Sequence, residues 1–540
     1  MLNLHKRYCR EKFVDGHLVE FTPVCNENFN FAYDVVDEIA SKQPTRRAML
    51  WCNDEGEERT FTFSDMKLYS DMTANLLKSL GVSKGDKVML ILKRRYEFWY
   101  FILALHKLGA VAVPVSNLLT PKDLIYRFSC VDIKGIVCFY DKEIINNVEC
   151  ALSVSKALDF KILVNGGIDG WLNFSSLLFK QDKKFKKVNT NVTDPILLYF
   201  TSGTTGMPKM VLHDNSYPLG HILTAKYWQK VVPDGLHFTI SDTGWMKSMW
   251  GKLYGQWFME AGIFVYDFKK FTPSDLLPLF SKYNLTTFCA PPTIYKFFIK
   301  EDLTKYDLSS LTKVTVAGEA LSLEVSDQFF KATGLRLMEG FGQSETSLVL
   351  FNMAGGDFKP GSIGKPSPAY KVDLIDANGK TTKTGEIGEI VIKTDVNRPY
   401  GMFSGYYLDD EKTREVWNNN IYHTGDMAWR DNDGYFWYTG RKDNIIKSSG
   451  YRIGPFEIES VIMELPYVLE CLVTGVPDEI RGQIVKATVV LANGYRPSDE
   501  LKKDLQMYVK KQTAPYKYPR VVEFVNEISK TISGKIKRFE

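Results

Sequence analysis

A loop rich in hydroxyl groups and glycines, with one lysine, follows a short apolar run near the middle of the chain. Residues 196–200 predict a strand, and residues 201–209 read Thr-Ser-Gly-Thr-Thr-Gly-Met-Pro-Lys. Glycines let backbone N–H groups turn toward an anion, hydroxyls add donors, and a lysine adds a mobile positive charge. The segment lacks the Gly-Lys-Ser/Thr ending of a Walker motif. It predicts a polyphosphate loop, with a plain surface turn as the alternative. The candidate binding residues are Thr201, Ser202, Gly203, Thr204, Thr205, Gly206 and Lys209.

A second glycine-rich segment, residues 338–346, reads Met-Glu-Gly-Phe-Gly-Gln-Ser-Glu-Thr. Its aromatic ring lies between two glycines and can present a face to a planar base, while the hydroxyl and the carboxylate that follow suit phosphate and Mg²⁺. The alternative is a glycine-rich strand end with an exposed acid. Nucleotide contacts are predicted for Glu339, Gly340, Phe341, Gly342, Gln343 and Ser344, and a magnesium contact for Glu345.

Two further residues suit the sugar of a nucleotide. Asp426 ends the segment Tyr-His-Thr-Gly-Asp, where its carboxylate can accept hydrogen bonds from both ribose hydroxyls. The alternative is a turn aspartate that caps its own backbone. Arg441, in Gly-Arg-Lys-Asp, can donate to ribose or phosphate because its rigid guanidinium suits pairs of oxygens.

Two segments near the C-terminus are ambiguous from their residues alone. Residues 447–455 read Lys-Ser-Ser-Gly-Tyr-Arg-Ile-Gly-Pro, which is ordinarily a loop glycine beside a solvated arginine. Residues 529–538 form a basic tail that contains Ser-Gly-Lys, and such tails are usually solvated chain ends.

Length and composition set limits on the fold and on the partners. A chain of 540 residues is too long for one core, so two or more domains are expected. With 44% hydrophobic residues, 24% charged residues and a net charge of +4, it is typical of a soluble globular protein without the basic excess of nucleic-acid binding. Its eight cysteines show no C-x-x-C spacing, and its first twelve residues carry no apolar run. Reduced, buried thiols and a cytosolic location are therefore expected.

The elements that must position these residues are predicted to be of the α/β class. From residue 61 onward, helical patterns alternate with short β-rich runs, as in helix-covered sheets. Examples are a helix over residues 64–80, capped by Ser64 and closed by Gly81, a core helix around residues 98–105, and a helix over residues 274–283 before a strand at 287–290. Short runs after Pro360 predict a small β-structure. The expected organisation is a large domain 1–440, a hinge 441–447 and an α+β domain 448–540.

Taken in order, the six motifs resemble those of the adenylate-forming (AMP-binding) superfamily of acyl-CoA synthetases, luciferases and peptide-synthetase adenylation domains, from about Tyr199 to the chain end. The medium-chain acyl-CoA synthetase branch, with its archaeal and bacterial members, is the most similar. That similarity lies in Tyr406, in residues 448–455 and in Ala-Pro-Tyr-Lys-Tyr-Pro-Arg at residues 514–520. The chain departs from the family pattern at Ser344, usually Thr, at Asn444, often an acid, and at Ser529, usually Pro.

The resemblance implies roles for the ambiguous segments. Lys535 would bridge the substrate carboxylate and the α-phosphate, Arg452 would meet the acyl-adenylate, and Thr201 and Glu345 would complete the catalytic set. Asp443 would be the hinge about which the C-terminal domain turns. The pantetheine arm of CoA would pass Gly450. The implied CoA contacts are Ser449, Gly450, Tyr451, Arg481, Lys510, Tyr518, Pro519 and Arg520.

The activity that the resemblance implies is AMP-forming carboxylate–CoA ligation with Mg²⁺, ATP and CoA and no side-chain nucleophile. Alternatives are transfer of the acyl group to a carrier protein and a catalytically dead sensor. Trp245 and Trp250 could form part of the wall of the acyl pocket, or they could simply pack in the core. Acetate-specific relatives carry a tryptophan where this chain has Gly342, so an open pocket floor and acids larger than acetate are expected. An acetate-preferring enzyme is the alternative.

Overall fold

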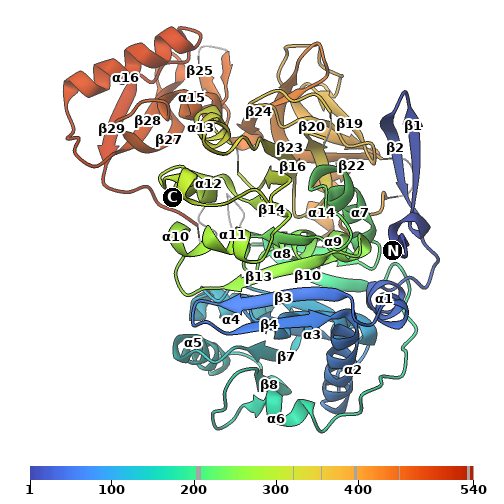
Figure 1. Ribbon diagram of the computed structural model, residues 1–540. Coiled ribbons are helices and arrows are strands. Elements are labelled where there is room, and N and C mark those ends of the chain that lie inside the picture. Colours follow the sequence, from blue (N-terminus) through green and yellow to red (C-terminus); the bar gives the residue numbers. More distant parts are fainter. Residues whose placement is uncertain are drawn as a thin grey trace.

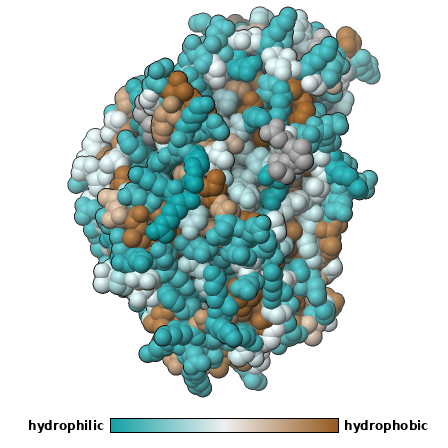
Figure 2. Space-filling view, turned by 90° about the vertical axis from the view of Figure 1, so that its right-hand side faces the viewer, coloured by the Kyte–Doolittle hydropathy of each residue, from teal (hydrophilic) through white to brown (hydrophobic). Residues whose placement is uncertain are grey.

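The computed structural model describes residues 1–201, 208–319, 321–353, 356–394, 398–448, 451–531 and 536–538, with only the backbone at Arg452. Two large sheets with their helices form the body of the molecule, and two smaller β-rich parts lie at one end of it (Figure 1). The predicted α/β class is confirmed. On the face drawn in Figure 2, hydrophilic residues predominate and hydrophobic ones lie in small separate groups. No described helix has both the length and the apolarity needed to cross a bilayer.

The first large sheet carries the predicted phosphate loop. Its strands are parallel from β10 to β9, and the hairpin partner of β10 runs antiparallel to both of its neighbours, β10 and the edge strand. The spatial order is β21 (Gly405–Tyr406), β11 (Lys209–Asp214), β10 (Pro195–Thr201), β6 (Val111–Pro114), β5 (Lys87–Ile91), β7 (Ile133–Cys138), β8 (Phe160–Leu163) and β9 (Leu172–Asn173).

The second large sheet carries the other glycine-rich segment. Its central strands, from β16 to β3, are parallel, so their carboxyl ends meet at one edge. The order is β18 (Lys365–Pro366), β17 (Leu348–Phe351), β16 (Leu337–Gly342), β15 (Lys313–Val316), β14 (Thr287–Ala290), β12 (Leu236–Thr239), β13 (Gly262–Asp267), β3 (Arg47–Asn53) and β4 (Glu58–Thr62).

One helix is buried between the two sheets. Every residue of α3 (Glu97–Leu108) is buried, and its side chains share a hydrophobic core with strands of both sheets. A helix that is apolar all round requires such a position, so the predicted core helix is confirmed. The remaining helices are α1 (Glu38–Lys42), α2 (Phe63–Ser79), α4 (Pro121–Cys130), α5 (Lys142–Leu152), α6 (Phe174–Leu178), α7 (Tyr217–Leu223), α8 (Lys247–Gly251), α9 (Tyr254–Phe258), α12 (Pro292–Phe298), α13 (Leu323–Thr333) and α14 (Asp410–Val416). Short 3-10 or π-helical turns are η1 (Leu4–Arg7), η2 (Ala32–Asp37), η3 (Thr224–Trp228), η4 (Leu303–Lys305) and η5 (Lys442–Asn444).

Two helix predictions need correction. The cap of α2 is Thr62, not Ser64, because Thr62 exchanges hydrogen bonds with Asp65 in a capping box. The predicted helix 274–283 is two short helices, α10 (Pro273–Leu276) and α11 (Pro278–Lys282). Leu277 keeps helical backbone angles, but Pro278 has no N–H to donate, so the helical hydrogen-bond pattern is interrupted there.

The smaller β-structure and the C-terminal part complete the chain. In the former, β19 (Lys371–Ile375), β20 (Gly388–Lys393), β23 (Ile421–Arg430) and β22 (Trp417–Asn418) follow in order, and β24 (Phe436–Arg441) pairs with β23. The C-terminal sheet contains β26 (Tyr451–Ile453), β25 (Ile446–Ser448), β28 (Gly482–Leu491), β27 (Val468–Asp478) and β29 (Val521–Val525), with helices α15 (Pro455–Ile462) and α16 (Asp499–Gln512). A separate hairpin, β1 (Cys9–Val14) with β2 (His17–Pro23), lies near the N-terminus.

Candidate active site

A cleft of about 2530 Å³ lies between the large body and the C-terminal part. Its walls include the carboxyl ends of β10, β15 and β16, the strands β23 and β24, helix α12 and the C-terminal tail. The described end of the tail, residues 536–538, belongs to this lining. Most of the residues that the sequence assigns to nucleotide binding line this one cleft.

The two ends of the predicted phosphate loop are fixed by a hairpin. Thr201 ends β10 and Lys209 begins β11, and the two residues are paired in the antiparallel register. Thr201 Oγ1 lies 3.5 Å from the carbonyl oxygen of Lys209. Both residues line the cleft. Ser202, Gly203, Thr204, Thr205 and Gly206 lie outside the described residues, so their predicted phosphate contacts stay predictions.

Lys209 lies near the carboxylate of Glu345. The Tyr406 hydroxyl donates to Glu345 Oε1 at 2.8 Å, and Lys209 Nζ lies 5.3 Å from the centre of the Tyr406 ring. Partial burial lowers the pKa of Lys209, and the nearby Glu345 carboxylate opposes that shift. The three side chains therefore put one cation, one carboxylate and one hydroxyl beside the loop, a set that suits a metal-bound polyphosphate.

A hydrogen-bond network connects the second motif to the two residues predicted for ribose. Gln343 Nε2 donates to Asp426 Oδ2 at 2.6 Å and to the Thr424 carbonyl at 2.8 Å. Arg441 Nη1 donates to the same two groups, at 3.2 and 2.8 Å. The Tyr438 hydroxyl donates to Asp426 Oδ1 at 2.8 Å. Burial raises the pKa of Asp426, while Arg441 and these donors act in the opposite direction.

The interpretation of Asp426 as a turn residue that caps its own backbone is wrong. Asp426 lies inside β23, buried, and its carboxylate accepts from three other side chains. Gly425 before it has φ +69°, and a Cβ there would come within 2.8 Å of Arg441 Nη2. Glycine is required at this position because both the backbone angle and the close guanidinium exclude a side chain.

Sequence reasoning missed two tyrosines of this network. Tyr422 donates to Gln343 Oε1 at 2.8 Å, and Tyr438 holds Asp426 and lies 6.2 Å, centre to centre, from the Phe341 ring. Tyr422 stands four residues before Asp426, and Tyr438 pairs near it across β23 and β24. Tyr422 begins the segment that ends in Asp426, but its contact with Gln343, and that of Tyr438 with Asp426, depend on how the strands pack.

The second motif forms β16 and the turn after it. Glu339 is buried, lines the cleft and accepts one weak hydrogen bond, from the Leu321 N–H at 3.4 Å. Burial raises its pKa to about 8, so its carboxyl group is largely protonated at neutral pH. A Cβ on Gly340 would lie 2.7 Å from the Trp228 ring, which explains the glycine there. Ser344 lines the cleft, and its carbonyl accepts from His213 Nε2 at 2.7 Å.

All three residues predicted for the acyl pocket line the cleft. Trp245 and Trp250 are half-buried and both line the cleft, so they are not simply packed in the core. Gly342 also lines it. However, a Cβ on Gly342 would lie 2.6 Å from the Ser347 carbonyl oxygen. The neighbouring backbone is therefore enough to account for a glycine at this position, and the open pocket floor stays a prediction.

The C-terminal tail forms part of the cleft wall. Thr531 and residues 536–538 line the cleft, and Lys535 between them lies outside the described residues. Arg538 holds the tail through Glu459 of α15, with Nη1–Oε1 at 2.7 Å and Nη2–Oε2 at 2.8 Å. This anchor was not predicted, because a basic residue at a chain end gives no sign of a buried partner.

The described residues among those predicted for CoA lie outside the cleft lining. Tyr451 stacks on Tyr516 with ring centres 4.0 Å apart. The Tyr518 ring has the cations of Lys510 and Arg520 at 5.7 and 4.9 Å. None of Tyr451, Arg481, Lys510, Tyr518, Pro519 and Arg520 is among the described residues that line the cleft. Ser449, Gly450 and the Arg452 side chain lie outside the described part of the chain.

Metal binding in this cleft would depend on the substrate. Among the described residues, no group of three or more histidine, cysteine, aspartate or glutamate side chains could hold a metal ion. A single carboxylate such as Glu345 fits Mg²⁺ because that ion commonly takes one or two carboxylates, with phosphate oxygens and water as its other ligands.

Comparison with protein families gives two matches. The model described as "AMP-binding enzyme" matches residues 36–407, and "AMP-binding enzyme C-terminal domain" matches residues 457–535. The chain belongs to the AMP-binding enzyme family. The resemblance inferred from the six motifs is confirmed.

Individual relatives agree with this assignment. The chain is 40% identical over 524 residues to human "Acyl-coenzyme A synthetase ACSM3, mitochondrial", covering 95% of this chain and 89% of that protein. It is 41% identical over 522 residues to mouse "Acyl-coenzyme A synthetase ACSM4, mitochondrial", covering 95% and 90%. Among solved structures, the anthranilate CoA ligase AuaEII with anthranoyl-AMP has a TM-score of 0.87 at 28% identity, covering 95% and 96%. A benzoate CoA ligase from Burkholderia xenovorans LB400 has a TM-score of 0.83 at 25% identity, covering 94% and 99%.

Proposed function

We propose that the chain converts a short- to medium-chain carboxylic acid, straight or branched, into its CoA thioester through an acyl-adenylate, with release of AMP and pyrophosphate. It is an AMP-forming acid–thiol ligase. One observation carries the proposal: the ends of the phosphate loop, Glu345 and the network of Gln343, Asp426 and Arg441 line one cleft whose opposite wall includes the C-terminal tail. The printed names of the acyl-CoA synthetase and CoA ligase relatives support the thioester product.

In the first half-reaction, a carboxylate oxygen of the acid attacks the α-phosphorus of ATP, and the bond to pyrophosphate breaks. Thr201, Lys209 and the loop between them hold the β- and γ-phosphates. Gln343, Asp426 and Arg441 hold the ribose, and the 340–342 segment takes the adenine. Lys535 and Arg452 neutralise charge on the carboxylate and the acyl-adenylate. Catalysis is positioning and charge neutralisation, so no side-chain nucleophile is required.

Magnesium belongs to this proposal. Glu345 would hold the ion together with phosphate oxygens of ATP, and the ion would supply charge neutralisation on the polyphosphate. The Tyr406 hydroxyl orients the Glu345 carboxylate for that purpose.

In the second half-reaction, the C-terminal domain turns about Asp443 and presents its Gly450 face to the acyl-adenylate. We assign residues 1–440 to the large domain, 441–447 to the hinge and 448–540 to the mobile domain. The CoA thiolate attacks the acyl carbon and AMP leaves. The CoA residues predicted around Tyr451 and Lys510 reach the cleft only after this turn, which accords with their present position outside its lining.

The compartment is also part of the proposal. We retain a cytosolic location, for which the free cysteines of a reduced environment are the support. The human and mouse relatives are mitochondrial by name. Fractionation of cells that express the tagged chain would decide between the two compartments.

The test is a panel of acids from acetate to octanoate, including branched and aryl acids, with ATP and CoA and with detection of AMP, pyrophosphate and acyl-CoA. The proposal expects all three products in equal amounts. Acyl-adenylate that is transferred only to a carrier protein would favour the carrier alternative, and nucleotide binding without pyrophosphate would favour the sensor.

A further inference from the structure

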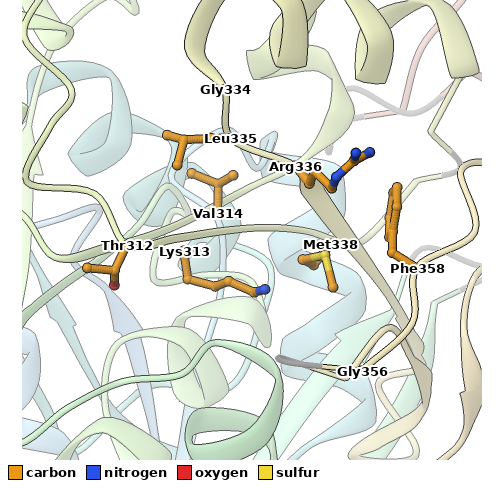
Figure 3. A pocket seen from close by; sticks show the side chains of 9 residues that line it. All are labelled: Thr312, Lys313, Val314, Gly334, Leu335, Arg336, Met338, Gly356 and Phe358. Atoms are coloured by element: carbon orange, nitrogen blue, oxygen red, sulfur yellow. The ribbon is translucent and has the colours of Figure 1, made fainter.

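A second pocket, of about 360 Å³, lies at the opposite ends of the strands that form the cleft. Strands β15 and β16 are parallel, and their carboxyl ends reach the cleft through Ala317 and Glu339. The pocket is formed at their amino ends, where Lys313 begins β15 and Arg336 precedes β16. Figure 3 shows its lining side chains. The two pockets share none of their described lining residues.

Two cations dominate the polar part of this pocket. Val314 pairs with Leu337 in the parallel register, so Lys313 and Arg336 stand next to each other on neighbouring strands. In Figure 3 the Lys313 ammonium group points into the space below Met338, and the Arg336 guanidinium lies toward Phe358. Each side chain brings a positively charged donor to the pocket lining, which suits an anionic ligand.

Within the described part of the chain, neither Lys313 nor Arg336 forms a salt bridge. Partial burial and the nearby Lys230 both lower the pKa of Lys313.

Apart from Thr312, the other lining side chains are apolar. Val314, Leu335, Met338 and Phe358 contribute side chains. The Arg336 guanidinium carbon lies 4.2 Å from the Phe330 ring centre and 5.4 Å from that of Phe358, so aromatic faces hold it in place. A cavity of this size accepts a small molecule. The combination of two cations and an apolar floor suits one anionic group on an apolar body.

We propose that this pocket is a second binding site, separate from the cleft, for a small organic anion with a single carboxylate or sulfonate group and an apolar body. Lys313 and Arg336 bind the anionic group, and Met338, Leu335 and Phe358 contact the body. The site is independent of the activity proposed above, because its residues take no part in nucleotide or acyl binding.

The test uses the full chain and benzenesulfonate, an anion that cannot be adenylated. The cleft is first saturated with a non-hydrolysable butyryl-adenylate analogue, whose own titration reports on the proposed function separately. Calorimetry should then show one benzenesulfonate per chain. Lys313→Met and Arg336→Gln should each weaken this binding at least roughly tenfold, because each removes a charged hydrogen-bond donor. Lys331→Met, which removes an exposed charge of α13 outside the pocket, should leave the affinity unchanged.

Thermal unfolding shows whether each variant is folded. Because Lys313 and Arg336 lie in different segments of the chain, misfolding of one variant would still leave the other to test the proposal. Sulfate, which lacks an apolar body, should bind at least about tenfold more weakly than benzenesulfonate. Absence of benzenesulfonate binding would overturn the proposal. Equal affinity in wild type and in folded Lys313→Met and Arg336→Gln, or equal affinity for sulfate, would do so too.

Discussion

Arg538 and Glu459 form a two-point salt bridge that fixes the C-terminal tail to helix α15. Both contacts are shorter than 3 Å, and the Arg538 guanidinium also donates to the Val473 carbonyl at 3.0 Å. The tail on either side of Lys535 lines the cleft. The bridge therefore sets where the segment that carries the proposed catalytic lysine can lie.

Breaking this bridge should impair adenylation selectively. Arg538→Met should lower acid-dependent pyrophosphate exchange at least about tenfold, because the tail loses its anchor while the ATP contacts of the large body remain. Thioester formation from synthetic acyl-adenylate and CoA should change much less. The unpaired Glu459 would also cost about 3 to 5 kcal/mol of stability in the C-terminal part.

Thermal unfolding of Arg538→Met and of the double variant with Glu459→Met separates these effects. The double variant should recover stability, because it leaves no buried unpaired charge, but not the exchange activity. Full exchange activity in the folded double variant would show that the bridge does not position the tail for catalysis.

Tyr406→Phe should weaken the binding of Mg-ATP. The change deletes the 2.8 Å hydrogen bond to Glu345 and nothing else of comparable strength. A hydrogen bond to a charged group contributes about 1.5 to 3 kcal/mol, so the KM for Mg-ATP should rise roughly tenfold or more. The KM for the acid should change little. Tyr407→Phe, at the next residue, is the matched control, and an equal effect of both changes would contradict the role given to Tyr406.

Glu339 predicts a pH dependence of stability. Its folded pKa is about 8, raised by burial from the ordinary value of 4.5. Between these two values only the folded chain holds the proton, so the free energy of unfolding falls as the pH rises through this window. The Glu339→Gln side chain cannot ionise, so this contribution to the fall of the free energy of unfolding with pH should be absent from the variant. The difference in Tm between Glu339→Gln and wild type should therefore increase from pH 5 to pH 8 and then level off. A constant difference would mean that Glu339 is ionised in the folded protein.

The acyl pocket should favour acids larger than acetate. Each methylene buried beside Trp245 and Trp250 adds roughly 0.8 kcal/mol, or about fourfold in kcat/KM, until the pocket is full. Trp250→Leu should shift the preferred chain length to longer acids, because a smaller side chain leaves more space in the acyl pocket. Trp437→Leu, which alters a tryptophan outside the cleft lining, is the control. A wild-type enzyme that prefers acetate would contradict this reading of the pocket.

Much of this architecture could be predicted from local patterns. The strand before the phosphate loop, the buried helix α3 and the strand β14 follow from apolar runs and periodicity. The break at Pro278 was missed because the apolar pattern continues through it, although proline alone marks such breaks.

The candidate site was only partly visible in the sequence. Asp426 and Arg441 were found through their motifs, but their partner Tyr438 depends on the register between β23 and β24. The Ser347 carbonyl that excludes a side chain at Gly342 comes from the far end of the turn between β16 and β17. Contacts of these two kinds are set by strand register and turn geometry, which the sequence patterns did not show.

The central claim is that one face of the C-terminal domain serves adenylation and another serves thioester formation. The most direct measurement compares both half-reactions in Lys535→Ala and Gly450→Leu: exchange of labelled pyrophosphate into ATP without CoA, and acyl-CoA formation from synthetic acyl-adenylate. Lys535→Ala should lose the exchange and keep the second reaction. Gly450→Leu should keep the exchange and lose the second, because a side chain would fill the pantetheine path. Equal loss of both half-reactions in either folded variant would contradict the account.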